Sequence, residues 1–163
     1  MRERAMTLGQ SIITCFRKYF VFSGRATRSE FWWFMLFRNV LISVPLSLTS
    51  VIASDTWNVV TVIPCLSAGA RRLHDMGRSG WWQALPLVSL PVFALSVWVL
   101  GDQAFALSPD LVTSLHGIVL IAGGVVLGLT LVLLIYWWVT PGTQGSNRFG
   151  EDPRGASAPN IFD

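Results

Sequence analysis

Five arginines in two short polar stretches suggest the most direct chemistry in this sequence, which is the binding of anionic oxygens. They are Arg25, Arg28, Arg71, Arg72 and Arg78. A guanidinium group recognises phosphate or carboxylate oxygens through paired, charge-assisted hydrogen bonds. Glycine and serine lie between the arginines of the second stretch, which indicates a shaped turn. Two interpretations stay open: the cluster binds an anionic ligand or a protein partner, or its charge only orients the chain.

His74 and Asp75 follow two of these arginines and suggest either an acid/base pair or a metal site. Two adjacent residues supply at most two ligands, whereas a zinc site needs three or four. The other histidine, His116, is predicted on the opposite side of the molecule. A structural alternative is that Asp75 pairs with a nearby arginine while His74 caps a turn or a helix end.

Arg38 and Asn39 are polar residues inside a long apolar run. A charged side chain in such a run must either extend to a polar boundary or find a buried partner. We consider both: Arg38 extends to the nearer boundary, or it pairs with Asp75 or Glu30 and lines a polar cavity.

Several common sites are missing from this sequence. It holds no GxxxxGK[ST], GxSxG or HExxH pattern, and Cys15 and Cys65 form no CxxC pair. We therefore predict no catalytic, cofactor-binding or metal-binding residues, no cofactor and no nucleic-acid partner.

The elements that carry these residues are predicted to be transmembrane helices. Of the 163 residues, 52% are hydrophobic and 13% are charged, against about 25% charged in a typical soluble domain. Apolar runs cover residues 31–53, 57–70, 81–100 and 115–139, and a helix crosses the hydrocarbon with roughly 20 residues. The fold class is therefore an all-α, polytopic membrane protein with four transmembrane helices and an N-terminal amphipathic helix.

The chain divides on this basis into an N-terminal segment (1–30), a transmembrane domain (31–139) and a C-terminal tail (140–163). In residues 7–20 the apolar side chains recur at helical spacing. They are Leu8, Ile12, Phe16 and Tyr19. This helix lies either in the membrane surface or against the rest of the protein. Residues 54–56 separate the first two runs, and two crossings fit if the turn begins a little before Ser54. A charged interruption is predicted at 70–80, and a polar loop at 101–114.

The distribution of positive charge predicts the orientation of the helices. With four crossings, eleven of the twelve Lys and Arg residues lie on one side, and the twelfth is Arg38. The positive-inside rule places that side, with both termini, in the cytoplasm. The eight tryptophans lie near predicted helix ends, as expected for interfacial belts. The basic cluster would then face the headgroups of an anionic leaflet.

The fourth apolar run contains Gly124 and Gly128 in a GxxxG pattern, which permits close approach of helices. The pattern serves either packing within the monomer or a homodimer.

Three stretches carry a family resemblance. They read FSGRATRSEFWW (22–33), ARRLHDMGRSGWW (70–82) and PGTQGSNRFGEDP (141–153). The chain resembles the bacterial inner-membrane family known as domain of unknown function 805 over roughly residues 10–153. The resemblance implies a four-helix inner-membrane protein and no particular reaction.

The favoured hypothesis is a non-enzymatic membrane protein whose basic cytoplasmic face binds anionic lipid headgroups or a protein partner. One alternative is a small transporter or channel component, suggested by Arg38, Asn39 and the prolines of the first two helices. The other is an enzyme acting on a phospholipid through His74 and Asp75.

Overall fold

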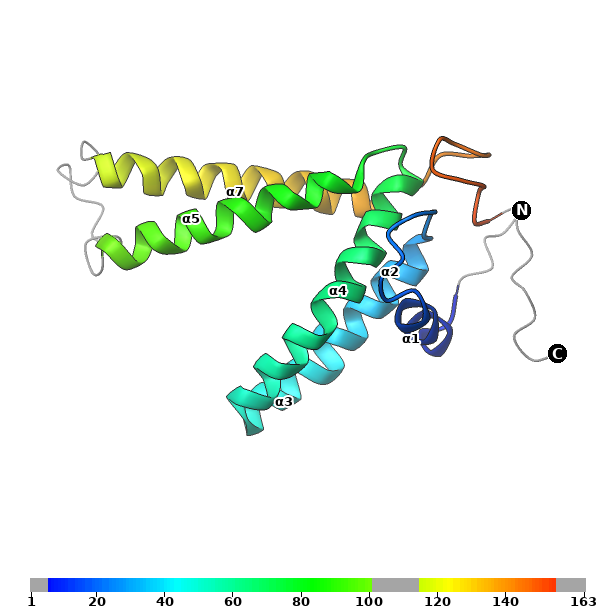
Figure 1. The fold of residues 1–163 in the computed structure, drawn as a ribbon, viewed down its shortest axis with the longest axis horizontal. Helices are drawn as coiled ribbons and strands as arrows, with labels where there is room; N and C mark the ends of the chain where they lie inside the picture. Colours follow the sequence, from blue (N-terminus) through cyan, green and yellow to red (C-terminus); the bar gives the residue numbers. More distant parts are fainter. Residues whose placement is uncertain (1–5, 101–114, 155–163) are drawn as a thin grey trace. The chain divides into compact units, whose positions relative to one another are not determined.

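The computed structural model describes residues 6–100 and 115–154. In this part of the chain the regular elements are helices, joined by turns and irregular segments, with one isolated bridge between Asn147 and Gly150 (Figure 1). Four helical stretches are long and apolar enough to cross a bilayer, which confirms the predicted fold class. They are Arg28–Thr49, Val51–Asp75, Gly80–Val99 and Gly117–Val139. The loop predicted at 101–114 lies outside the described residues.

The first span consists of three consecutive segments, and a short helix precedes it. The short helix is α1 (Leu8–Arg17), and the three segments are α2 (Arg28–Met35), the π-helix η1 (Leu36–Ser43) and α3 (Val44–Thr49). The second span is α4 (Val51–Asp75). The third begins with the 3-10 turn η2 (Gly80–Gln83) and continues as α5 (Ala84–Leu100), and the fourth is α7 (Leu115–Val139).

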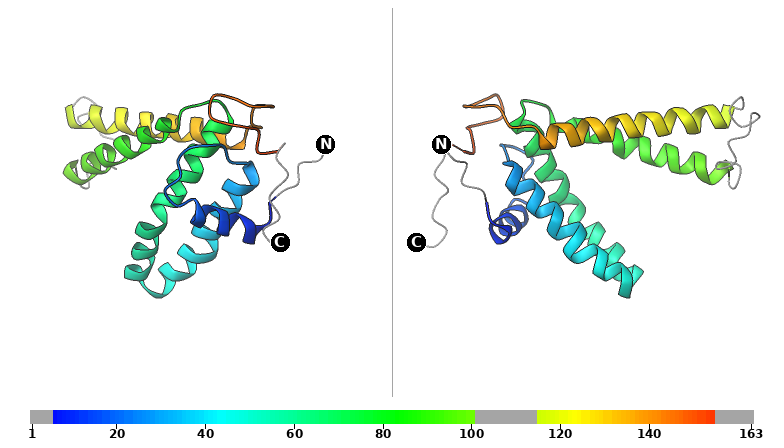
Figure 2. Two further views of the ribbon diagram at one scale, coloured as in Figure 1. Left: turned by 45° about the vertical axis from the view of Figure 1, so that its right-hand side comes forward. Right: turned by 180° about the vertical axis from the view of Figure 1, so that it is seen from behind.

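The chain divides into two compact units, which are described separately. One is Met1–Gly80 with Trp138–Asp163, and the other is Trp81–Trp137. In the second unit α5 and α7 run side by side (Figure 2). A Cβ atom at Gly124 would lie 3.1 Å from Cε2 of Phe93, so this glycine lets the two helices approach closely. Packing within the monomer therefore uses Gly124, and a homodimer through Gly124 and Gly128 stays a prediction.

The turn between the first two spans lies at Ser50, a little before Ser54, as two full crossings require. Ser50 has an extended backbone (φ −157°, ψ 115°), and its side chain accepts a hydrogen bond from the backbone N–H of Ala53. Residues 54–56 fall in the first two turns of α4. Their polarity marks the end of the apolar run, but serine and aspartate are also well tolerated near a helix N-terminus, where the helix dipole favours negative charge.

The charged interruption predicted at 70–80 starts too early, because α4 continues through Asp75. The helix ends at Gly77, which has a positive φ of 69°. The backbone N–H of Gly77 donates to the carbonyl of His74, and that of Arg78 donates to the carbonyl of Leu73. This pair of bonds is the Schellman pattern, in which a left-handed glycine closes a helix.

Helix α1 packs against α2 and α4, which is one of the two arrangements considered for it. Thr7 caps the helix with Gln10 as its reciprocal partner. The ring of Phe16 meets Phe34 edge-on, with centroids 5.7 Å apart, and Tyr19 donates to the carbonyl of Val60. Cys15 lies in the hydrophobic core with Phe31, Phe34 and Ala68. The apolar stripe of α1 is thus engaged by protein.

The thiol of Cys15 tests this packing. Cys15 is fully buried, and burial, followed by the charge of Glu30, raises the pKa of its thiol to about 12. Because only the thiolate reacts, we expect maleimide to label Cys15 on the order of 100-fold more slowly than an exposed cysteine at neutral pH. The background for the measurement is Cys65→Ala.

The matched control is Ile13→Cys in a chain lacking both native cysteines, because Ile13 lies on the same helix and is 49% exposed. Labelling is followed by intact-protein mass spectrometry between pH 7 and 9. Equal rates at positions 15 and 13 would mean that α1 does not pack on the spans.

Candidate functional site

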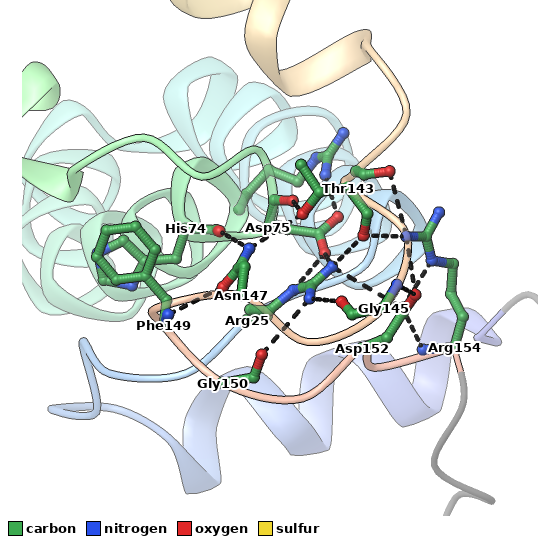
Figure 3. A network of polar contacts seen from close by, with 12 residues as sticks. Arg25, His74, Asp75, Thr143, Gly145, Asn147, Phe149, Gly150, Asp152 and Arg154 are labelled. Atoms are coloured by element: carbon green, nitrogen blue, oxygen red, sulfur yellow. Dashed lines mark hydrogen bonds and ion pairs between the residues drawn. The ribbon is translucent and has the colours of Figure 1, made fainter.

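The three stretches singled out in the sequence meet in one polar network with a buried centre, in the first unit (Figure 3). We call it the motif network. It joins the α1–α2 linker, the end of α4 and the segment that follows α7. Its members are Arg25, Arg72, His74, Asp75, Thr143, Gly145, Asn147, Phe149, Asp152 and Arg154.

Asp75 lies at the centre of the network and is 3% exposed. Its Oδ1 accepts from Arg25 at 2.9 Å to Nε, with Nη2 at 2.8 Å, and its Oδ2 accepts from Nη1 of Arg72 at 2.6 Å. Its backbone carbonyl accepts from both the N–H and the hydroxyl of Thr143. One carboxylate thus compensates two buried guanidinium groups. This confirms the structural alternative for Asp75, pairing with nearby arginines.

Arg25 ties the α1–α2 linker to the C-terminal segment. Its Nη1 donates to the carbonyl of Gly145 and its Nη2 to the carbonyl of Thr143. Next to it, the N–H of Ala26 donates to the carbonyl of Arg71 at 3.0 Å. The side chain reaches these acceptors from a linker whose own backbone is fixed to α4.

Arg72 ties the last turn of α4 to the end of the fourth span. Its Nε donates to the carbonyl of Trp138 at 3.0 Å, and its Nη2 donates to the carbonyl of Thr140. Carbonyl groups at a helix C-terminus lack partners within the helix, so a buried cation satisfies both their hydrogen bonding and the helix dipole.

A second buried ion pair joins Arg71 to Glu30 of α2, and these side chains are 1% and 5% exposed. The hydroxyl of Ser11 donates to the backbone carbonyl of Glu30, which brings α1 to the same place. The Nε and Nη2 atoms of Arg71 are buried without a hydrogen-bond partner among the described residues. Arg71 is thus held by its ion pair and by packing.

His74 has partners that differ from those of Asp75. Its Nδ1 lies 3.1 Å from the carbonyl oxygen of Gly24, and its ring stacks on Phe149 with centroids 4.0 Å apart. The guanidinium of Arg148 lies over the Phe149 ring, 4.6 Å from its centroid. Because His74 and Asp75 are each engaged in separate structural contacts, they do not form the acid/base pair that a phospholipid-acting enzyme would need.

The C-terminal segment is shaped by short contacts of its own. Asn147 donates to the carbonyl of His74 at 3.0 Å, and Asp152 accepts from Arg154 and from the N–H of Gly145. Hydrogen bonds from the Arg154 side chain, followed by its backbone N–H, lower the pKa of Asp152 to about 2. This carboxylate therefore stays ionised at any physiological pH.

The structure divides the predicted binding residues into two groups. Arg25, Arg71, Arg72 and Asp75 are buried, Arg28 and His74 are half-buried, and Arg78 is exposed. Sequence reasoning did not select Arg17, Lys18 or Arg148 for this site, although all three are exposed on the same unit. It also missed Thr143 and Asn147, which bond the backbone carbonyls of Asp75 and His74 and each other, contacts that leave no pattern in the sequence.

Arg38 lies in η1, away from the motif network, and neither predicted partner holds it. Its Nε donates to the hydroxyl of Thr61 on α4, and its Nη1 donates to Oδ1 of Asn39, both at 2.8 Å. The predicted pairing with Asp75 or Glu30 is wrong, because these acids pair with the arginines of α4 and of the α1–α2 linker.

The four spans and the motif network describe a multi-pass helical membrane protein whose span ends are joined by ion pairs. The chain belongs to the family described as "Protein of unknown function (DUF805)", whose model matches residues 19–151. The matched region contains the first two motif stretches and all but the last two residues of the third. The predicted family is thereby confirmed.

Its relatives include named membrane proteins of Escherichia coli. Inner membrane protein YhaI of strain K12 is 30% identical over 151 residues, covering 89% of this chain and 96% of YhaI. Inner membrane protein YhaH is 29% identical, covering 58% of this chain and 92% of YhaH. The uncharacterized protein YiiR is 32% identical, covering 82% and 86% of the two chains. The chain is therefore an integral, multi-pass inner-membrane protein. No solved structure matches it significantly.

Gly142 provides a steric test of the motif network. A Cβ atom at this position would fall on the carboxylate of Asp75. We expect Gly142→Ala to displace that carboxylate and to lower the free energy of unfolding by about 1–3 kcal/mol, as for other overpacked sites. The measurement is chemical or thermal unfolding of the full chain in mild detergent.

Gly9→Ala is the matched control, because nothing lies within 4 Å of a Cβ atom at this position in α1. Alanine in a helix should leave stability unchanged or slightly raise it. If Gly142→Ala unfolds at the same midpoint as Gly9→Ala, Asp75 does not occupy the position described.

Proposed function

We propose that this protein is non-enzymatic and that a basic surface on its cytoplasmic side binds anionic lipid headgroups. The basic surface consists of the exposed side chains Arg17, Lys18, Arg78 and Arg148. The observation that supports the proposal is the difference in burial among the arginines. Arg25, Arg71 and Arg72 form buried ion pairs that hold the unit together. The side chains of the basic surface are exposed.

Apolar side chains next to the basic surface suit a membrane boundary. Phe20, Val21 and Phe22 lie two to four residues after Lys18 and are 72%, 41% and 44% exposed. Cations beside exposed aromatic and aliphatic groups are typical of segments that lie at the headgroup level of a bilayer. Each such cation contributes about 1 kcal/mol to attraction by an anionic leaflet.

The cytoplasmic orientation is part of the same proposal. The described Lys and Arg residues outside the spans lie before the first span, between the second and third, or after the fourth. An even number of crossings places these three regions on one side, and the motif network joins them. The positive-inside rule makes that side the cytoplasm.

The proposal predicts which arginines control lipid binding. Changing the four residues of the basic surface to glutamine should reduce retention of phosphatidylglycerol and cardiolipin on the full chain by on the order of tenfold or more at low salt. The matched control keeps the charge, with Arg17→Lys, Lys18→Arg, Arg78→Lys and Arg148→Lys together. Native mass spectrometry from mild detergent measures bound lipid, and unfolding midpoints verify the fold.

Unchanged retention of acidic lipid in the glutamine variant would contradict the lipid role. If that variant instead loses a co-purifying protein, the partner is a protein. Orientation is tested with an Arg78→Cys variant lacking both native cysteines. A membrane-impermeant maleimide should label it in inverted vesicles, and labelling in intact spheroplasts would overturn the cytoplasmic assignment.

A small transporter or channel component is the second candidate, because one observation favours it. Arg38 lies in the first span, and an ionisable residue at this depth is commonly functional. Its neighbours Asn39, Ser43, Asn58 and Thr61 form a polar seam between the first two spans. A substrate anion would have to reach this seam from water.

A further inference from the structure

We propose that Arg38 is a docking point within the membrane for a transmembrane helix of another protein that carries a carboxylate. The proposal depends on the spans alone and does not rest on lipid binding by the basic surface. It starts from the depth of Arg38, then considers its partners, and then asks which anion can reach it.

Arg38 is held near the middle of the bilayer by its contact with Thr61. Thr61 lies ten residues from Val51 at one end of α4, which is about 15 Å along a helix. It lies eleven residues from Arg72, the first member of the motif network on α4, which is about 16 Å, so the distance to the other side is similar. Lipid phosphates lie outside a hydrocarbon core of about 30 Å, and are therefore remote from this guanidinium.

The contacts of Arg38 with the described residues are to uncharged groups. Nε donates to Thr61 and Nη1 to Asn39, and none of the ion pairs formed within residues 6–100 and 115–154 includes Arg38. These two bonds fix the plane of the guanidinium. Among the described residues, Nη2 and one N–H of Nη1 have no hydrogen-bond acceptor, and guanidinium donors of this kind bind carboxylate or phosphate oxygens.

The backbone around Arg38 is also fixed. Its carbonyl oxygen accepts from the hydroxyl of Ser43 at 2.9 Å and from Nε1 of Trp57 at 3.2 Å. The segment is a π-helix, Leu36–Ser43, a form that is rare and that frequently occurs at functional sites. The guanidinium is thus presented by a rigid backbone, and is half-buried.

The chain cannot supply the missing negative charge from its own spans. Glu30 and Asp75 are paired elsewhere. Asp55 lies six residues before Thr61 on α4, about 9 Å nearer the end of that helix. The third and fourth spans contain no acidic residue. A second copy of this chain has the same composition, so a homodimer cannot compensate Arg38 either.

An acidic side chain on the helix of another protein satisfies these conditions. At this depth it requires no aqueous path, and charged residues within membranes usually pair with one another. The surface near Arg38 suits a helix, since Val40, Leu41 and Val44 of the same span are exposed and apolar. Charge complementarity therefore favours a transmembrane helix with one Asp or Glu near its middle.

Designed peptides test this inference on the full chain. The chain, with a fluorescence donor, is reconstituted in phosphatidylcholine vesicles, which contain no anionic headgroup. Acceptor-labelled polyleucine transmembrane peptides carry a central Glu or a central Gln. We expect the Glu peptide to associate with the chain on the order of tenfold more tightly than the Gln peptide.

The variants assign this preference to Arg38. Arg38→Gln should remove it, Arg38→Lys should keep most of it, and Arg17→Gln, which removes a cation outside the spans, should leave it unchanged. Equal association of both peptides with the native chain would overturn the inference, and this comparison needs no variant. Loss of the Glu peptide in millimolar inorganic phosphate would also overturn it, because Arg38 would then bind a solute anion from water.

Discussion

The arrangement of the first unit depends on one buried carboxylate, that of Asp75, shared by two buried guanidinium groups. Its side chain is 4% exposed, and those of Arg25 and Arg72 are 1% and 0% exposed. A buried charge that loses its partner costs about 3–5 kcal/mol, so a site of this kind is stable only when complete. Arg25 comes from the α1–α2 linker, and Arg72 and Asp75 come from the end of α4. Both arginines also donate hydrogen bonds to carbonyl groups of the C-terminal segment. The structure therefore ties the ends of three spans through a single acidic residue.

This constraint means that Arg25 and Arg72 do more than orient the chain in the membrane. Orientation needs only positive charge on one side of the membrane, whereas Arg25 and Arg72 each donate to a carboxylate and to carbonyl groups at defined positions. Glu30 and Arg71 form a second buried ion pair next to α1. Arg17, Lys18, Arg78 and Arg148 are exposed, and the proposed lipid binding is assigned to them for that reason. Arg38 differs from both groups, since its partners are uncharged.

Local properties of the sequence predicted the spans. The features that were not predicted depend mainly on contacts between residues far apart in the sequence. Hydropathy placed the fourth helix at 115–139, which agrees with α7. It located the first turn only as a little before Ser54, because Ser50 is selected by backbone geometry and the polar residues 54–56 fit inside a helix. Arg71 and Arg72 were predicted in a loop because their charges looked exposed, yet Glu30 and Asp75 allow them to be buried on α4. The roles of Thr143 and Asn147 could not be predicted, since their side chains donate to backbone carbonyl groups, which every residue carries.

The most direct test of the central claim is amide hydrogen exchange in the native chain and in Asp75→Asn. The amides to follow are Ala26, which donates to Arg71, and Thr143, which donates to Asp75. If the shared carboxylate holds the span ends together, both amides are protected in the native chain and both lose protection in Asp75→Asn, while the amides of α7 keep theirs. Fast exchange of Ala26 and Thr143 in the native chain, or unchanged protection in the variant, would contradict the account.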